Sequence, residues 1–193
     1  MKDKSDIISD AKEKLILEGI SDIEKNGIQG LSLRRVANNC SLSCAAPYKH
    51  FKDKGDFIYE IICYINQQWY IRQKKVLSSC PKDLRSQLIA VSLEYIKFLY
   101  ENPHFRSIIM LKDNIIEPDQ AKLKSELSVT SKDLINRYCK EVKIHEKRRT
   151  IKTFIVRSFI YGAALMFDNG ELEYNEENFN LIAKTIEREF DLD

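Results

Sequence analysis

Basic side chains gather in one stretch of this chain, residues 32–54, with the sequence SLRRVANNCSLSCAAPYKHFKDK. The stretch holds one acidic residue, Asp53, and five basic ones: Arg34, Arg35, Lys49, Lys52 and Lys54. It carries a net charge of +4, and because the whole chain carries +2, the remaining residues sum to −2. Concentrated positive charge neutralises phosphate groups, so we expect a phosphate-binding surface here.

The same stretch contains the signals of two short helices joined by a tight turn. A first helix can begin after a cap at Ser32, and its apolar residues recur at the spacing of one buried face: Leu33, Val36 and Ala37. Turn-forming residues follow at 38–41, and Ser43 can cap a second helix over 44–50. Pro47 falls near the first turn of that helix, where its missing N–H costs least. The pattern predicts a helix-turn-helix.

With these features the first third of the chain, from about Ile8 to Ile62, resembles the DNA-binding domain of the TetR/AcrR family of transcriptional regulators. The residues that carry the resemblance are, in order, Gly27-Ile28, Gly30-Leu31-Ser32-Leu33, Val36-Ala37, Leu42-Ser43, Ala46-Pro47-Tyr48-Lys49-His50-Phe51 and Lys54. One departure concerns the turn, where the family usually has Ala-Gly and this chain has Cys40-Ser41. The missing glycine predicts a slightly strained turn. The remainder of the chain is similar to the family in length and helical character.

A helix-turn-helix places individual residues in different roles on DNA. The N-terminal part of the second helix meets base edges, and the side chains there are Ser43, Cys44 and Ala45. Most protein–DNA bonds reach phosphate and sugar, and the residues that follow suit such contacts: Tyr48, Lys49 and His50. Lys54 stands where a lysine and the N–H groups of a helix start could hold a phosphate. Ser32 and Arg34 complete the predicted DNA-binding set.

Several of these residues have a simpler interpretation that the sequence leaves open. Ser43 could serve only as a helix cap, and Lys49 could be an ordinary surface lysine. Of Arg34 and Arg35, one should point away from DNA, because neighbouring residues of a helix do not share a face.

Hydrophobic periodicity predicts helices along the whole chain and hence an all-α fold of about nine helices. We expect an N-terminal helix-turn-helix head, residues 1–54 and extending to about 62, and a helical body, residues 55–193. Outside the helix-turn-helix, the expected helices span 5–26, 53–78, 81–101, 104–111, 119–142, 146–168 and 176–190. The resemblance implies that the body binds an effector and forms a dimer.

The expected helix over 146–168 is apolar nearly all round towards its C-terminal end. Such a helix must be buried on both sides, and in a chain of this size one side can be covered by a partner subunit. The resemblance implies that the last two helices, about 146–168 and 176–190, form a four-helix homodimer interface. The alternative is a single core helix buried within one chain.

Aromatic and Met side chains are dense in the body and suggest a ligand cavity. The candidates are Trp69, Tyr95, Phe98, Phe105, Met110, Tyr138 and Phe159. Because these positions carry no charge, they favour an apolar or aromatic effector. The alternative is plain core, since aromatic residues at helical spacing are the usual filling of an α-helical domain.

Other classes of function find little support in the sequence. Motifs for a phosphate-binding loop, a nucleophile elbow, a zinc protease or a dinucleotide fold are missing, so we expect no enzyme, cofactor or metal. Cys40 and Cys44 offer at most a weak thiol-sensor or metal pattern. An odd number of cysteines at irregular spacings fits a reduced cytoplasmic protein, and we expect no signal peptide and no membrane span.

Together these features predict a homodimeric transcriptional regulator that binds double-stranded operator DNA. We expect a repressor that a small-molecule effector releases from DNA. The alternative is a DNA-binding protein without an effector, such as an architectural or cell-division factor.

Overall fold

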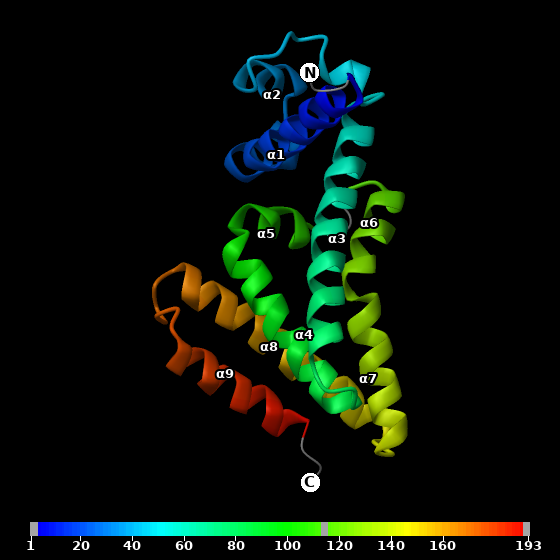
Figure 1. Cartoon of the computed structure of the whole chain (residues 1–193), viewed down its shortest axis with the longest axis vertical. Coiled ribbons are helices and arrows are strands. Elements are labelled where there is room, and N and C mark those ends of the chain that lie inside the picture. The colour runs from blue at the N-terminus through cyan, green and yellow to red at the C-terminus, as the bar shows by residue number, and fades with distance from the viewer. Residues whose placement is uncertain (1–3, 113–115, 191–193) are drawn as a thin grey trace. The chain divides into compact units, whose positions relative to one another are not determined.

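The computed structural model describes residues 4–112 and 116–190, with only the backbone described for 4–9. All regular secondary structure in these ranges is helical, which confirms the expected all-α fold (Figure 1). The α-helices are α1 (Lys4–Gly30), α2 (Leu33–Asn39), α3 (Lys54–Ser79), α4 (Leu84–Glu101), α5 (Pro103–Ile109), α6 (Pro118–Ser125), α7 (Val129–Glu141), α8 (Glu146–Asp168) and α9 (Glu176–Glu189). Short 3₁₀-helices lie at Pro47–Lys49 and Glu126–Ser128.

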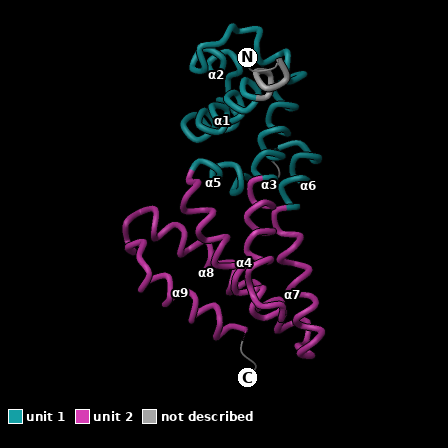
Figure 2. The backbone as a smooth tube through the Cα atoms, viewed as in Figure 1, with its two compact units in different colours: residues 1–67, 104–126 teal, residues 68–103, 127–193 magenta. Residues whose placement is uncertain are grey.

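Two compact units make up the chain (Figure 2). Unit 1 comprises Met1–Gln67 and His104–Glu126, and unit 2 comprises Gln68–Pro103 and Leu127–Asp193. The helix α3 therefore contributes its first half to unit 1 and its second half to unit 2. This division by compactness differs from the sequence-based boundary at residue 54, because α5 and α6 pack with the N-terminal helices.

Unit 1 is built around a core of α1, α2 and the start of α3. Its fully buried side chains include Leu15, Ile20, Ile23, Val36, Phe51, Phe57 and Ile61. A side chain at Gly19 of α1 would meet the ring of Phe57 at 2.4 Å, so only glycine allows α1 and α3 to approach this closely. At Gly27 the backbone turns into the left-handed region, with φ of 69°, and α1 kinks there. This position matches the expected stop of the first helix, although helical turns resume up to Gly30.

Polar and aromatic side-chain contacts join α5 and α6 to the rest of unit 1. The ring of His104 contacts the carboxylate of Glu24 on α1, and the rings of Phe105 and Tyr64 meet edge to face at 6.2 Å. The buried amide of Gln120 on α6 donates to the carbonyl of Gly55 at the start of α3, over 2.9 Å. These contacts explain why the segment 104–126 belongs to unit 1.

Unit 2 is organised around α4, which packs against α7, α8 and α9. Two expected helices differ here from the sequence prediction. The helix expected from Pro81 begins at Leu84, because Asp83 caps it by accepting a bond from the N–H of Ser86. The single helix expected over 119–142 is two helices separated by the 3₁₀ segment Glu126–Ser128.

Only one face of α8 is covered within unit 2. The buried face contains Val156, Ile160, Ala163, Ala164 and Phe167, whereas the large apolar side chains left exposed are Ile151, Phe154, Ile155, Leu165 and Met166. Within the described residues, α8 is also the helix that is long and apolar enough to span a membrane by composition alone, with a mean hydropathy of 1.3. A helix whose exposed apolar face packs against a partner protein can have the same length and composition.

Candidate nucleic-acid interface

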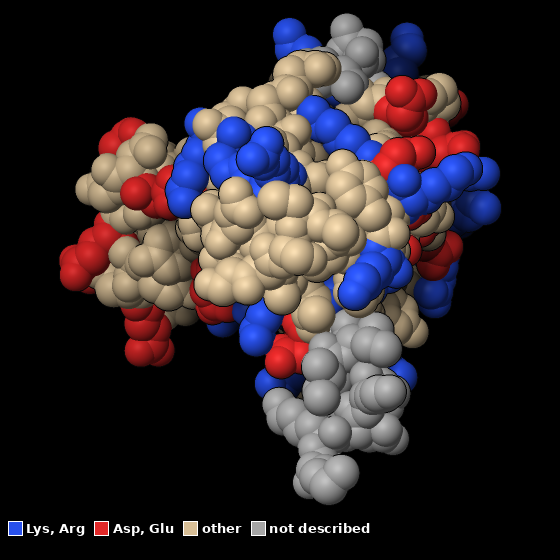
Figure 3. Space-filling model, turned by 90° about the horizontal axis from the view of Figure 1, so that it is seen from above, with Lys and Arg blue, Asp and Glu red and all other residues tan. Residues whose placement is uncertain are grey.

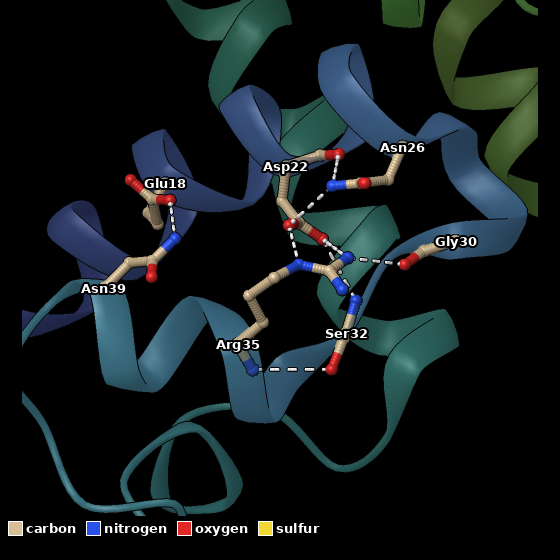
Figure 4. A network of polar contacts seen from close by, with 7 residues as sticks. All are labelled: Glu18, Asp22, Asn26, Gly30, Ser32, Arg35 and Asn39. Atoms are coloured by element: carbon tan, nitrogen blue, oxygen red, sulfur yellow. Dashed lines mark hydrogen bonds and ion pairs between the residues drawn. The ribbon is translucent and has the colours of Figure 1, made fainter.

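The helix α2 is held on α1 by a polar network centred on a buried carboxylate, Asp22 (Figure 4). Asp22 accepts bonds from Nε and Nη2 of Arg35, at 2.5 and 2.7 Å, and from the backbone N–H of Ser32 at 3.1 Å. Arg35 also donates to the carbonyl of Gly30 over 2.7 Å, and Asn26 donates to Asp22 over 3.1 Å. Arg35 is therefore the arginine that points inward, as the sequence allowed for one of the pair.

Burial alone would raise the pKa of the Asp22 carboxyl, but the hydrogen bonds outweigh it. The bonds from Arg35, Ser32 and Asn26 and the positive charge of Arg35 leave the pKa of Asp22 below its ordinary value of 3.8. Asp22 is thus ionised at neutral pH and acts as the acceptor that fixes the start of α2. Sequence reasoning missed Asp22, although its position seven residues after the buried Leu15 places it on the inner face of α1.

Ser32 acts as the cap of α2, as its position predicts. Its side chain accepts a bond from the N–H of Arg35 at 3.4 Å, and its backbone is extended, with φ of −129°. Leu33, Val36 and Ala37 are the buried residues of α2, which confirms the expected inner face.

The helix α2 ends in a turn whose residue with a left-handed backbone is a serine rather than a glycine. The N–H of Leu42 donates to the carbonyl of Ala37 over 2.9 Å, and that of Ser41 donates to Asn38 over 3.0 Å. This pair of bonds is a Schellman motif, and it places Ser41 at φ of 58°. The strain expected from the missing glycine is therefore located at Ser41.

Replacing Ser41 by glycine is expected to stabilise the protein by about 1 kcal/mol, because a left-handed backbone penalises a residue with a Cβ atom. Gly170 lies at φ of 71° in an equivalent turn after α8, so Gly170→Ala should shift stability by about the same amount in the opposite direction. Urea unfolding followed by circular dichroism measures both changes. A destabilised Ser41→Gly variant would contradict this account of the turn.

The second helix of the expected helix-turn-helix is not an α-helix in this structure. Residues 44 and 45 form a turn, residue 46 a bend, and Pro47–Lys49 a single 3₁₀ turn. The N–H of Ala46 bonds to the backbone carbonyl of Ser43 over 2.8 Å, so the hydroxyl of Ser43 is not the expected cap. The physical reason is that Pro47 has no N–H to donate, while burial of Pro47 and Phe51 holds the backbone of the segment in another conformation.

Apolar anchors hold this segment on unit 1 and turn its polar side chains outward. Pro47 is buried, and Phe51 is buried against Phe57, with their ring centroids 4.6 Å apart. The exposed residues of the predicted DNA-binding set are Arg34, Ser43, Cys44, Ala45, Tyr48 and Lys49. In space-filling view, Lys and Arg side chains form several clusters separated by uncharged surface (Figure 3). The structure thus leaves both basic and short side chains of the set accessible.

Lys54, one of the predicted DNA contacts, is less free than the sequence suggests. The ammonium group of Lys54 donates to the carbonyl of Gln29 over 2.9 Å and so ties α3 to the end of α1. At the start of α3, Asp53 accepts from the N–H of Asp56, and Asp56 accepts from that of Lys52, both over 2.8 Å. These carboxylates occupy N–H groups that a phosphate would use, so a DNA contact by Lys54 stays a prediction.

His50 is half-buried beside Phe51. Burial, together with the positive charges of Lys12 and Lys49, lowers the pKa of its imidazole below the ordinary 6.5. His50 is therefore neutral at pH 7, and any bond to a phosphate comes from a neutral ring N–H.

The predicted ligand residues lie in several places. Trp69, Tyr95 and Phe98 form one aromatic cluster in unit 2, with centroid distances of 4.8, 5.3 and 6.2 Å. Tyr138 is also in unit 2, where its hydroxyl donates to the carbonyl of Phe190, and Phe159 is half-buried. Phe105 and Met110 belong to unit 1, and Met110 is 44% exposed.

Next to the aromatic cluster, sequence reasoning missed a buried amide. Gln73 lies one helical turn after Trp69 on α3 and is only 5% exposed. Its Nε2 has no hydrogen-bond partner in the described part of the chain. A buried donor without a partner is costly and calls for an explanation, such as an acceptor on a ligand.

The cysteines offer little chemistry in this arrangement. Burial and the charge of Glu18 raise the pKa of the Cys40 thiol, although Lys14 opposes them. Cys44 is exposed, and its thiol lies 3.6 Å from the amide oxygen of Asn38. Among the residues that the structure describes, no group of three His, Cys, Asp or Glu side chains could hold a metal ion.

Several solved structures with this fold are described as transcription regulators. A TetR family transcription regulator from Marinobacter aquaeolei VT8 has a TM-score of 0.76 and 16% identity, over 94% of this chain and 96% of its own. A putative TetR family regulator from Shewanella sp. PV-4 has a TM-score of 0.75 and 12% identity, over 92% and 95%. AibR, solved with isovaleryl coenzyme A and operator DNA, has a TM-score of 0.69 and 13% identity, over 92% and 96%.

Neither a family model nor a curated protein sequence matches this chain. At such low identity the likeness concerns the fold, and the chain has the fold of TetR-family transcription regulators over nearly its whole length.

Proposed function

We propose that this protein is a transcriptional regulator that binds operator DNA through α2 and the segment Ser43–Lys49. The observation that carries the proposal is the accessible set of short and basic side chains on a head with the TetR-like fold. Arg34 is exposed on α2 and makes no hydrogen bond or ion pair with any described residue, so it is available to a phosphate. Lys49 is exposed at the end of the 3₁₀ turn.

Replacing Lys49 or Arg34 by alanine is expected to weaken binding to all duplex sequences alike. Each change should lower the slope of log affinity against log salt by about 0.9, because one phosphate contact is lost. Fluorescence anisotropy with a duplex selected from a random library measures both quantities. The control is Lys74→Ala, which removes an exposed lysine from α3 in unit 2. Unchanged affinity and slope in both head variants would refute the assigned docking face.

A homodimer is the second part of the proposal. The exposed face of α8 carries Ile151, Ile155, Leu165 and Met166, and Leu181 of α9 is 60% exposed. Large apolar side chains exposed together on one helix face often mark an interface with another protein. A second copy would supply the second half of a two-fold symmetric site on DNA, with the half-sites about one helical turn apart.

The third part concerns control by a small molecule that binds in unit 2 and releases the protein from DNA. The cluster of Trp69, Tyr95 and Phe98 and the unpartnered amide of Gln73 support this part. An effector releases a repressor only if it binds the DNA-free conformation more tightly. The protein then acts in the cytoplasm, on DNA and without a catalytic step. A regulator without an effector remains the alternative, and the ligand experiment below distinguishes the two.

A further inference from the structure

An open groove of about 630 Å³ lies between α7 and α8 in unit 2. Its volume falls within the range of small-molecule sites in proteins. The apolar part of its lining comes from Ile135 and Phe154, and hydroxyl groups come from Thr150, Thr153, Ser158 and Tyr161. None of the ligand residues expected from the sequence lines it, although Tyr138 and Phe159 lie on the same two helices.

The charged side chains of the groove are all positive: Lys132 on α7, and Arg149 and Arg157 on α8. Arg149 already has partners, because it donates to Asn136 and to Glu146, each over 3.1 Å. Lys132 and Arg157 make no hydrogen bond or ion pair with the residues that the structure describes. The neighbouring Asp133 pairs with Arg137 instead, at 3.5 Å. Two positive side chains in one groove, without a negative partner among the described residues, favour the binding of an anionic ligand.

The helices place these two cations about one helical turn apart along the groove. A short turn connects α7 and α8, so they run antiparallel, and the bond between Arg149 and Asn136 sets their register. In that register Lys132 stands opposite Thr153, one helical turn and about 6 Å along α8 from Arg157, since a helix rises about 1.5 Å per residue. An anionic group between these two long side chains would leave room for an apolar body beside Ile135 and Phe154.

Near Arg157 the groove also reaches the aromatic cluster. The ring of Tyr161, in the groove wall, meets that of Tyr95 edge to face at 6.3 Å, and Tyr95 packs on Trp69 at 4.8 Å. Burial and Tyr161 raise the pKa of Tyr95, and the charge of Arg157 acts in the opposite direction, so Arg157 lies close enough to influence this buried ring. The wall of the groove therefore contacts the core of unit 2 through Tyr161.

We propose that this groove is the effector site and that its ligand is an amphipathic organic anion, with a carboxylate or phosphate held by Lys132 and Arg157. The proposal deepens the function proposed above and rests on it for the effect on DNA. It also changes the effector class expected from the sequence, which was apolar or aromatic without a charge. The bound anion would neutralise the two cations, and its apolar body would cover Ile135 and Phe154.

Calorimetry on the purified protein with three naphthalene probes tests the proposal. We expect 2-naphthoate or 2-naphthyl phosphate to bind at least tenfold more tightly than the neutral 2-naphthylmethanol, because charge-assisted bonds are stronger than neutral ones. The tighter of the two anions identifies the headgroup. Arg157→Gln and Lys132→Gln should each weaken that anion about tenfold and leave the alcohol unchanged. The control variants Lys140→Gln and Arg148→Gln remove exposed charges outside the groove lining and should have no effect.

Equal binding of anions and alcohol, or anion affinity that neither groove variant changes, would overturn the proposal. A second measurement adds the tighter anion to the protein–DNA complex. DNA affinity should fall for the unmodified protein and stay constant for Arg157→Gln. If the anion binds the groove and DNA affinity does not change, the groove is not the effector site. Failure to bind any DNA would refute the proposed function instead, and the calorimetry would still decide whether the groove takes an anion.

Discussion

Replacing Asp22 by alanine is expected to destabilise unit 1 by about 2–4 kcal/mol and to abolish DNA binding. The buried carboxylate accepts bonds from the side chains of Arg35 and Asn26 and from the N–H of Ser32. Its removal leaves these three donors without their shared acceptor and the start of α2 without its anchor. Urea unfolding and anisotropy with selected DNA measure the two effects.

A matched control is Asp10→Ala, which removes an exposed carboxylate from the same helix. Asp10 pairs with Lys14 one turn away, at 3.4 Å, and such surface pairs are worth at most about 0.5 kcal/mol. If the two variants were equally stable, Asp22 would have no special role in holding α2.

The stability that Asp22 supplies should depend on pH in a defined direction. Because its pKa is lower in the folded protein than the ordinary 3.8, the contribution is fully present above that value and is lost as the pH falls through the folded pKa. The difference in stability between the protein and Asp22→Asn should therefore be constant from pH 7 to about 5 and shrink below 3.8. A difference that grew on acidification would contradict the assignment.

A charge in the exposed face of α8 is expected to convert the proposed dimer into a monomer. Ile151 is 57% exposed and lies on the face that has no cover within unit 2, so Ile151→Glu should leave the folded chain intact. In the dimer, the same glutamate would be buried without a partner, which should weaken association at least 100-fold. Light scattering should then give a mass near 22.6 kDa.

The matched control is Ile71→Glu, because Ile71 is an isoleucine of α3 with a similar exposure of 54%. The control should remain a dimer. Affinity for a two-half-site duplex should fall about 100-fold for Ile151→Glu alone, because binding of the second head becomes a separate event. A wild-type monomer at micromolar concentration, or equal behaviour of the two variants, would show that α8 is not the interface.

Much of the fold could be predicted from local sequence signals. The periodic apolar residues of α2 and the cap at Ser32 are confirmed, because these depend on neighbours within one or two helical turns. The span of α8 agrees with the expected 146–168, since His145 caps its start and Asn169-Gly170 end it. The strained turn was also predictable, because the demand for a left-handed residue at Ser41 follows from its place in the motif.

Longer-range features were not predictable in this way. The helix expected over 44–50 is a turn and a 3₁₀ segment, because burial of Pro47 and Phe51 holds a backbone that local propensity alone does not determine. The helix expected over 119–142 is interrupted at 126–128, where the carbonyl of Leu127 accepts a bond from the indole of Trp69, 58 residues away in sequence.

The candidate sites likewise combine features that the sequence predicts with features that only the tertiary structure shows. By itself the sequence determined the helical class, the basic segment Ser32–Lys54 and the apolar character of α8, because composition and spacing along one helix carry that information. Only the tertiary structure decided that Arg35 turns inward to Asp22 while Arg34 stays accessible, and that Lys132 and Arg157 share one groove. These pairings join residues 13 and 25 positions apart, and their partners are set by how whole helices pack rather than by any local pattern.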